Sequence, residues 1–422
     1  MMRGRIDLLS PPFAGHLHPI IGMARALHAH HDVRVVTTPS AAVRVRAAGI
    51  DSVSMLEGWE GRLADIVDTP TAVGSNPLRL YGQLSKSFQV HEQVRMELER
   101  LYQFSRPDLV IADFTMVATG AVTNAYGIPW WTSLPSPCVL EGGDGPPCYL
   151  GGLSPMAGMI GESRDRLGWA AIRGFKRLVG TLLRDELRRV GIASVYRADQ
   201  TEAAYSNQQI IALGWQDLEF RHSWPSSVCF IPPFLYSPPV PCEAPSFAPS
   251  RQHVLVTLGT HVRWIKDTAA EAVQEVAAQT PHIEYHFSDG DVGCTRTHHR
   301  QGNFQRLPYI DYDHVKRYDL VIHHGGAGIT AHCLAQGRPA IVYPIDYDQF
   351  DNASRLEYAG LAHRLRHLDG LRQAIVSTLN DEALRARCER FSRGHDTSHG
   401  PALLRAKVDA LLYASAPDPT LT

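Results

Sequence analysis

Short runs of β-branched residues alternate with helical stretches along this chain, and the alternation occurs twice. In the first half, strands are expected at residues 6–10, 33–37, 109–112, 129–133, 210–213 and 228–231, with helices at 20–30 and between 113 and 126. In the second half, strands are expected at residues 254–257, 283–287, 320–323 and 340–343, with helices at 267–279, 329–336 and 349–359. Strand–helix–strand repetition of this kind predicts an α/β fold in which helices cover both faces of parallel sheets.

A proline-rich segment separates the two halves. Residues 236–250 contain five prolines, and proline lacks a backbone donor and resists both helix and central strand. We therefore expect a semi-rigid linker, which gives an N-terminal domain of residues 1–235, a linker of 236–252 and a C-terminal domain of 253–422. The last helix of the chain is a candidate to pack back on the first domain. Ligands of such sheets lie beyond the carboxyl ends of the strands, so the expected site is a cleft between the domains.

The composition argues against several classes of protein. The formal net charge is −2. This near balance is untypical of proteins that bind nucleic acid, and of proteins that bind membranes through a polybasic surface. Seven cysteines occur singly with no CxxC pair, which predicts neither a disulfide framework nor a zinc site, and favours the reducing cytoplasm. No apolar run approaches the roughly 20 residues of a membrane span. The basic run at residues 164–189 is expected to be a solvated face, with membrane contact as the alternative.

A glycine-rich turn is the most informative segment. Residues 323–330 read HHGGAGIT, follow an apolar strand and open a helix. Glycines let the backbone approach a ligand closely, and the free N–H groups and the dipole of a helix start form an anion site. His324 would add a donor to a phosphate oxygen. The alternative is a turn that holds only a buried histidine.

The next strand end carries a second group of polar residues. Residues 344–353 read PIDYDQFDNA, and their carboxylates and amides are suited to hydrogen bonds with vicinal hydroxyls. A phosphate site beside a hydroxyl-binding site suits a nucleotide sugar. The alternative role for Asp348 is the N-cap of the following helix.

Together these segments resemble the UDP-glycosyltransferase superfamily, the inverting enzymes that include natural-product glycosyltransferases. The matching residues are Gly15-His16 with Pro19, Leu258-Gly259-Thr260, the loop from His324 to Thr330, and Asp348-Gln349 with Asn352-Ala353. They occur in the family's order and spacing. The resemblance implies the GT-B fold, in which two Rossmann-like domains face each other across a cleft, with the acceptor on the first domain and the donor on the second.

The resemblance also implies roles for the residues that contact the donor. His324 would hold the diphosphate together with the backbone amides of the turn, which are those of Gly326, Ala327, Gly328 and Ile329. Asp348 and Gln349 would hold the sugar hydroxyls, and Thr260, with Gly259 before it, would lie near the phosphate. Tyr309 stands where the family often has a tryptophan that stacks on the base.

The sequence departs from the family at two of these positions. Asp311 stands where a proline is usual, and Ile329 stands where serine or threonine is usual, which removes one hydroxyl contact to phosphate. Thr330 is a candidate to replace that contact. His261 is a further candidate for a phosphate or base contact.

Two polar residues at strand ends are the predicted catalytic pair. An acceptor hydroxyl must lose its proton as it attacks, so a base must lie within hydrogen-bond reach. His16, expected in a loop after the first strand, matches the family's base, and Asp113 matches the aspartate that orients it and stabilises its charged form. The alternatives are a surface or capping role for His16, an N-cap role for Asp113, and His18 as a rival base.

The predicted function is thus transfer of a sugar from a UDP- or dTDP-sugar to a hydroxyl of a small, apolar acceptor such as a natural product or lipid. No metal and no cofactor other than the nucleotide sugar is expected, because no HExxH pattern occurs. Trp130 and Trp131 are candidates for an acceptor pocket or for the core. The rival functions are a nucleotide-sugar 2-epimerase or hydrolase, and a non-catalytic partner of a glycosyltransferase.

Overall fold

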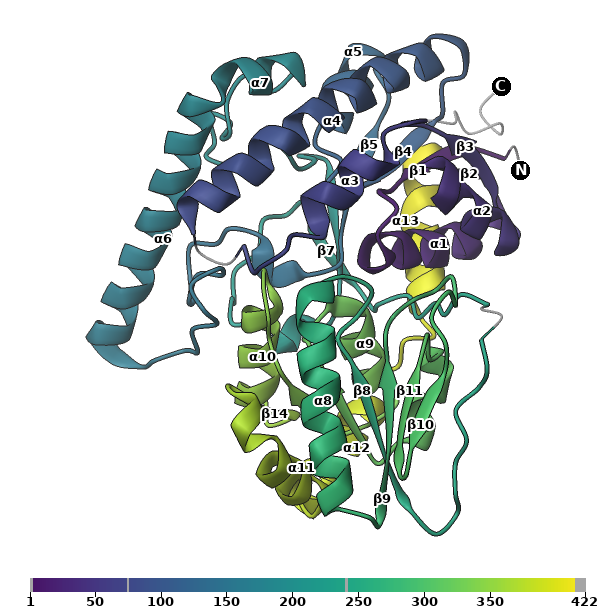
Figure 1. The fold of residues 1–422 in the computed structure, drawn as a ribbon. Coiled ribbons are helices and arrows are strands. Elements are labelled where there is room, and N and C mark those ends of the chain that lie inside the picture. The colour runs from purple at the N-terminus through teal and green to yellow at the C-terminus, as the bar shows by residue number, and fades with distance from the viewer. Residues whose placement is uncertain (1–2, 74–75, 240–241, 414–422) are drawn as a thin grey trace.

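A computed structural model describes residues 3–73, 76–239 and 242–413. It contains two seven-stranded sheets, one on each side of the predicted linker (Figure 1). Residues 240–241 of that linker and residues 414–422 of the predicted C-terminal domain lie outside the described residues.

The first sheet has the order β3-β2-β1-β4-β5-β6-β7, and its strands pair in parallel. The strands are β1 (Arg5–Leu9), β2 (Asp32–Thr37), β3 (Asp51–Ser54), β4 (Leu109–Asp113), β5 (Trp130–Leu134), β6 (Gln209–Leu213) and β7 (Val228–Ile231). The helices of this half are α1 (Ala14–His28), α2 (Pro39–Ala47), α3 (Glu60–Val67), α4 (Pro77–Phe104), α5 (Thr119–Ala125), α6 (Gly158–Leu182) and α7 (Arg184–Arg189).

The second sheet has the order β10-β11-β9-β8-β12-β13-β14, and only the edge strand β10 pairs antiparallel. The strands are β8 (Gln252–Thr257), β9 (Ile283–Ser288), β10 (His299–Gln301), β11 (Phe304–Leu307), β12 (Leu320–His323), β13 (Ala340–Val342) and β14 (Ala362–Arg364). Its helices are α8 (Arg263–Gln279), α9 (Ala327–Ala335), α10 (Gln349–Tyr358), α11 (Leu371–Leu379), α12 (Glu382–Gly394) and α13 (Gly400–Tyr413).

The last helix belongs in space to the first half of the chain. Figure 1 shows α13 in yellow beside α1, far from the other C-terminal helices. Leu404 and Val408 of α13 are fully buried in one core cluster with Leu17 and Ile20 of α1. The chain therefore crosses between the two halves twice, once through the proline-rich segment and once before α13.

Helix α1 begins six residues earlier than the sequence pattern predicts. It starts at Ala14 and contains Pro19, so the loop expected around His16 is a helix instead. The pattern placed the start at residue 20 because proline usually marks a helix boundary. Here Pro19 stands only in the second turn, and the apolar side chains on both sides of it, including Leu17 and Ile20, are buried in the core.

The basic run at 164–189 forms most of α6 and all of α7. It was predicted to be a solvated polar face, but its outer side is less polar than that. Arg173 and Lys176 lie against Glu141 on the inner side of α6. The outer side exposes large apolar residues, namely Ile160, Leu167, Leu178 and Leu182. In the part of the chain that the structure covers, no helix combines the length and the apolar character needed to cross a membrane.

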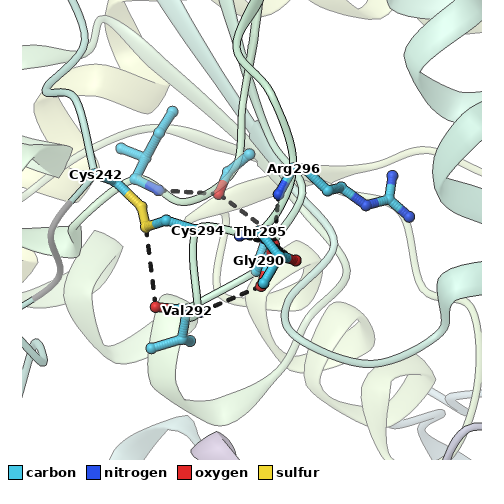
Figure 2. Close-up of a disulfide and its surroundings, with 10 residues drawn as sticks. Cys242, Gly290, Val292, Cys294, Thr295 and Arg296 are labelled. Atoms are coloured by element: carbon cyan, nitrogen blue, oxygen red, sulfur yellow. Dashed lines mark hydrogen bonds between the residues drawn. A yellow bond between two sulfur atoms is a disulfide. The ribbon is translucent and has the colours of Figure 1, made fainter.

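The prediction that no disulfide is present is wrong. Cys242, in the linker, is bonded to Cys294, in the loop after β9, with Cα atoms 5.8 Å apart (Figure 2). Sequence reasoning missed the pair because its members are 52 residues apart in a chain with no cysteine motif. Their meeting depends on the linker running along the second half of the molecule. The cysteine argument for a cytoplasmic location is weakened, because reducing compartments keep thiols free.

The disulfide predicts a redox-dependent stability. Closing a loop of this length restricts the unfolded chain and contributes about 4 kcal/mol to the free energy of unfolding in the loop-entropy account. Thermal melting of the oxidised protein should therefore give a higher Tm than melting in dithiothreitol. Cys294→Ser should melt at the lower temperature under both conditions, while the control Cys229→Ser, which removes a free thiol, should keep the redox response. Equal Tm values for the oxidised and reduced native protein would refute the bond.

Candidate active site between the two sheets

A cavity of about 550 Å³ lies between the two halves of the chain, at the carboxyl ends of both sets of strands. Ten predicted donor residues line it: Gly259, Thr260, Tyr309, His324, Gly326, Ala327, Gly328, Ile329, Asp348 and Gln349. His16 lines it from the first half. The strand ends bring these residues together from segments more than 300 positions apart, as expected for facing α/β sheets.

The glycine-rich turn closes tightly around the imidazole of His324. A β-carbon on Gly326 would lie 2.4 Å from His324 Nε2, and one on Gly259 would lie 2.7 Å from His324 Cε1. Gly259 and Gly325 also have φ angles of 75° and 93°, which glycine adopts without strain. Only glycine therefore lets the ends of β8 and β12 meet on the two sides of this ring.

Two neutral histidines shape the same turn. The Gly325 N–H donates to His323 Nδ1 at 3.1 Å, so this nitrogen is unprotonated. Burial lowers the pKa of His323 to about 3 and that of His324 to about 4. Helix α9 then starts at Ala327 with no side chain capping it, and the residues at this helix start line the cavity. An uncapped helix start beside an imidazole is a ready site for an anion.

Two side chains after β13 are held by hydrogen bonds, one of which crosses between the two halves and one of which lies within the loop itself. Asp348 Oδ2 accepts from the Ser136 hydroxyl at 2.5 Å. Asp348 occupies the N-cap position of α10, yet its side chain makes no cap hydrogen bond. Gln349 Oε1 accepts from the N–H groups of Ile345 and Asp346, at 2.9 and 3.1 Å. The side-chain oxygen of Gln349 thus holds the loop, and its side-chain Nε2 is the group that can bind a ligand.

A hydrogen-bonded pair is formed by His16, which is partly exposed to the cavity, and Asp113, which is buried. His16 Nδ1 lies 3.0 Å from Oδ1 and 3.1 Å from Oδ2 of Asp113, and a carboxylate acceptor places the proton on Nδ1. Nε2 is then the free base. Asp113 does not cap α5, which starts only at Thr119; instead its Oδ1 accepts from the N–H and the hydroxyl of Thr115. Asp113 is only 1% exposed.

The surroundings of His16 favour its charged form. Burial opposes the charge, but the charge of Asp113 and the hydrogen bond to it outweigh burial, so the pKa of His16 is raised. The charge of Asp348 acts in the same direction. The ring also stacks on Phe114, with centroids 5.5 Å apart.

The rival base His18 has a different environment. Its ring faces Tyr236 at 5.4 Å, and burial lowers the pKa of His18 to about 3. Residues two apart on a helix point about 200° apart, so His18 does not share the carboxylate of Asp113. An imidazole with so low a pKa is a weak base at neutral pH.

Comparisons with known proteins agree with this geometry. Residues 253–394 match the glycosyltransferase family 28 C-terminal domain. The chain is 24% identical to L-demethylnoviosyl transferase of Streptomyces niveus over 86% of its own length and 85% of the relative's. Its structure is similar to that of the glycosyltransferase SnogD from Streptomyces nogalater, with a TM-score of 0.68, 20% identity, and coverage of 97% and 100% of the two chains. It is also similar to the Streptomyces sp. SF2575 glycosyltransferase SsfS6 in complex with thymidine diphosphate, with a TM-score of 0.67, 17% identity, and coverage of 97% and 100%.

Residues 253–394 are thus a glycosyltransferase family 28 C-terminal domain, and the whole chain is similar in sequence and fold to glycosyltransferases of the UDP-glycosyltransferase superfamily. It is a glycosyltransferase with the GT-B fold, as the sequence motifs predicted. The roles of individual residues remain predictions, which the geometry above makes specific.

Three weaker predictions for this glycosyltransferase have mixed outcomes. His261 lines the cavity, but its Nδ1 is paired with Asp68 at 3.2 Å across the two halves. The side chain of Ile329 packs in a core cluster, so this position offers only its backbone. Trp130 and Trp131 are buried in core clusters and do not line the cavity.

Several residues of the site were not found from the sequence. Ser136 contacts Asp348 yet lies in no recognisable motif, and His323, the first residue of the glycine-rich segment, was given no role of its own. Lys266 donates to the carbonyls of Gly259 and Asp289 at 2.7 and 2.6 Å, and burial lowers the pKa of Lys266 to about 8. The only signal for Lys266 was its place one turn into the helix after Thr260. Within the residues placed by the structure, no three His, Cys, Asp or Glu side chains gather as metal ligands.

The His16–Asp113 pair predicts the pH dependence of transfer. The base must be neutral, so kcat/KM should rise with pH through the pKa of His16, which lies above 6.5. Asp113→Asn removes the charge that raises this pKa, so the rise should move to lower pH, while the plateau rate falls about 10²-fold or more because the tautomer is no longer fixed. The exposed control Asp185→Asn should leave both unchanged. A pH profile that is identical in the native enzyme and Asp113→Asn would remove the base from His16.

Proposed function

We propose that this enzyme transfers a sugar, with inversion, from a UDP- or dTDP-sugar to a hydroxyl of a small, mostly apolar acceptor. One observation carries the proposal: His16, hydrogen-bonded to Asp113 behind it, and an uncapped helix start beside His324 line the same cavity from opposite domains. A base and an anion site on two sides of one space are what direct displacement at an anomeric carbon needs.

The proposed mechanism assigns one proton transfer and one displacement. Nε2 of His16 takes the proton of the acceptor hydroxyl as its oxygen attacks the anomeric carbon of the donor. The bond to the nucleoside diphosphate breaks, and the amides at the start of α9 and His324 stabilise the negative charge that develops on the leaving oxygen. Asp113 stabilises the imidazolium that forms. Because helix and imidazole supply this stabilisation, we expect the reaction to proceed without a metal ion.

The relatives support the choice of a pyrimidine donor. SsfS6 was crystallised with thymidine diphosphate, and L-demethylnoviosyl transferase and the glycosyltransferase SnogD both come from Streptomyces species. We extend this donor class and a natural-product acceptor to the present enzyme. The rival functions are less well supported, because an epimerase or hydrolase needs no acceptor site, whereas the cavity has a large apolar wall beside the proposed donor site.

Donor binding has a direct test in the presence of EDTA. A ligand held only by the folded state raises its stability by about 2.7 kcal/mol at 100 times Kd, which corresponds to a rise in Tm of roughly 5 °C or more for a domain of this size. UDP or dTDP should give such a rise in a thermal-shift assay, and GDP and ADP a smaller one. His324→Ala should abolish it, while the exposed control His282→Ala should not. The absence of a rise with every nucleotide would overturn the proposed donor class.

The acceptor side of the cavity is an apolar wall with a polar row. The wall comes from α3, α4 and the segment after β4, with side chains from Leu63, Ile66, Val67, Val90, Val94 and Met116. Along α4, Gln83, Ser87 and His91 follow at intervals of four residues, which places them on one helix face, and all three line the cavity. His91 Nδ1 is buried with no hydrogen-bond partner among residues of known position, and burial lowers the pKa of His91 to about 4. We infer that neutral His91 binds a second oxygen of an otherwise apolar acceptor.

Acceptor screening tests this role of His91. Rigid phenols and alcohols should be compared in matched pairs that keep the reacting hydroxyl and differ in one remote oxygen, such as 2-naphthol with 2,6-dihydroxynaphthalene, and estratrien-3-ol with estradiol. The native enzyme should favour the member with two oxygens, and His91→Phe should reduce that preference about 3- to 10-fold in kcat/KM, the worth of one hydrogen bond. The Kd for UDP or dTDP should stay constant. An unchanged preference would contradict the role of His91.

A further inference from the structure

Helix α1 presents two histidines to the cavity, and they differ in what they contact. His16 pairs with Asp113, stacks on Phe114 and lies near the charge of Asp348. His18 lies against the ring of Tyr236, which belongs to the linker. Both histidines line the cavity. The proposed role of His16 is that of the base, but the proposed mechanism gives His18 no role.

Three polar atoms of residues that line the cavity have no hydrogen-bond partner. They are His18 Nε2, the Tyr236 hydroxyl and Thr330 Oγ1, and each is buried without a hydrogen bond to any residue that the structure places. They come from α1, the linker and α9, and all three residues line the cavity. Buried polar atoms are nearly always paired, and leaving one unpaired costs free energy. Such a group of unpaired atoms beside a cavity indicates that a bound ligand supplies their partners.

The neighbouring residues of α9 and the second sheet enclose the same region. His332, one turn along α9 from the turn of glycines, is close enough to lower the pKa of His18. Tyr312 contacts His332 edge to face at 5.3 Å and stacks on Tyr309 at 6.4 Å. Rings from both domains and the linker therefore border this part of the cavity.

The order of groups in a nucleotide sugar decides which part of the donor reaches this region. The diphosphate lies at the start of α9 in the proposed function. The sugar lies toward Asp348 in the proposed function, and Asp348 lines the same cavity as His16. The nucleoside must extend from the other end of the diphosphate, toward His332, Tyr309 and Tyr236.

We propose that His18 and Tyr236 bind oxygen atoms of the donor's nucleoside, so that the N-terminal domain and the linker hold the donor together with the C-terminal domain. This inference rests on the proposed function. A neutral imidazole and a phenol hydroxyl suit ribose hydroxyls and pyrimidine carbonyls, and they offer little to a phosphate charge. The unpaired atoms lie just beneath the cavity surface, and a side-chain rotation of the kind common on binding brings them to the ligand.

Nucleotide affinities of point variants test the proposal. Tyr236→Phe removes a single oxygen, and its Kd for UDP or dTDP in titration calorimetry should rise about 3- to 10-fold. His18→Leu should give a rise of similar size, and His18→Gln, whose amide can replace Nε2, should recover part of the affinity. Tyr126→Phe is the matched control, because its hydroxyl bonds to Glu99 away from the cavity, and it should bind like the native enzyme.

Inorganic pyrophosphate separates this role from a general loss of the site. It keeps the diphosphate and lacks the nucleoside, so the variants should bind pyrophosphate as the native enzyme does. A comparison of UDP with dUDP then shows whether the 2′-hydroxyl or the base is the group bound. Unchanged UDP and dTDP affinities in Tyr236→Phe and His18→Leu, or an equal loss for pyrophosphate, would overturn the inference while the proposed function stands. A native enzyme that binds none of these probes would overturn both.

Discussion

The imidazole of His324 lies between the ends of two strands, with no room for a β-carbon at Gly326 or Gly259 on either side of it. This contact sets the distance between the loop after β8 and the turn after β12, and so fixes where α9 begins. Gly325 also lies close to the loop after β13, since a β-carbon on Gly325 would lie 2.9 Å from the backbone oxygen of Gln349. The anion site and the hydroxyl-binding loop are therefore parts of one rigid unit, whose parts cannot shift independently in a close-packed interior.

Hydrogen bonds and an ion pair between the domains place the turn after β12 and the loop after β13 opposite His16, the proposed base. Ser136 holds Asp348, Asp68 holds His261, and a buried ion pair joins Glu219 to Arg355 at 2.7 Å. Such a buried pair is weak evidence for stability, because desolvation offsets much of its attraction. Its value lies in orientation, since charges removed from water tolerate few alternative arrangements. These non-covalent contacts thus hold the two halves of the site in a fixed position relative to each other.

Sequence reasoning succeeded where a few adjacent residues carry the geometry, and it failed where distant segments meet. The turn after β12 and the strand end at Asp113 were predicted because strand, glycine and helix follow one another directly. The Cys242–Cys294 bond, the Ser136–Asp348 contact and the wall from α4 were not predicted, because each depends on how far segments fold back in space. The early start of α1 was missed since Pro19 signals a boundary locally, while burial of Leu17 and Ile20 overrides that signal.

The two histidines of α1 differ more in environment than in position, and the proposed catalytic role of His16 rests on that difference. Both stand near the start of one helix, and both line the same cavity. Asp113 raises the pKa of His16, whereas burial without a carboxylate lowers the pKa of His18 to about 3. A base for an acceptor hydroxyl must gain from becoming charged, and only the first imidazole has a partner that provides this. The same helix can therefore offer a proton acceptor at one end of the donor and a neutral hydrogen-bonding ring at the other.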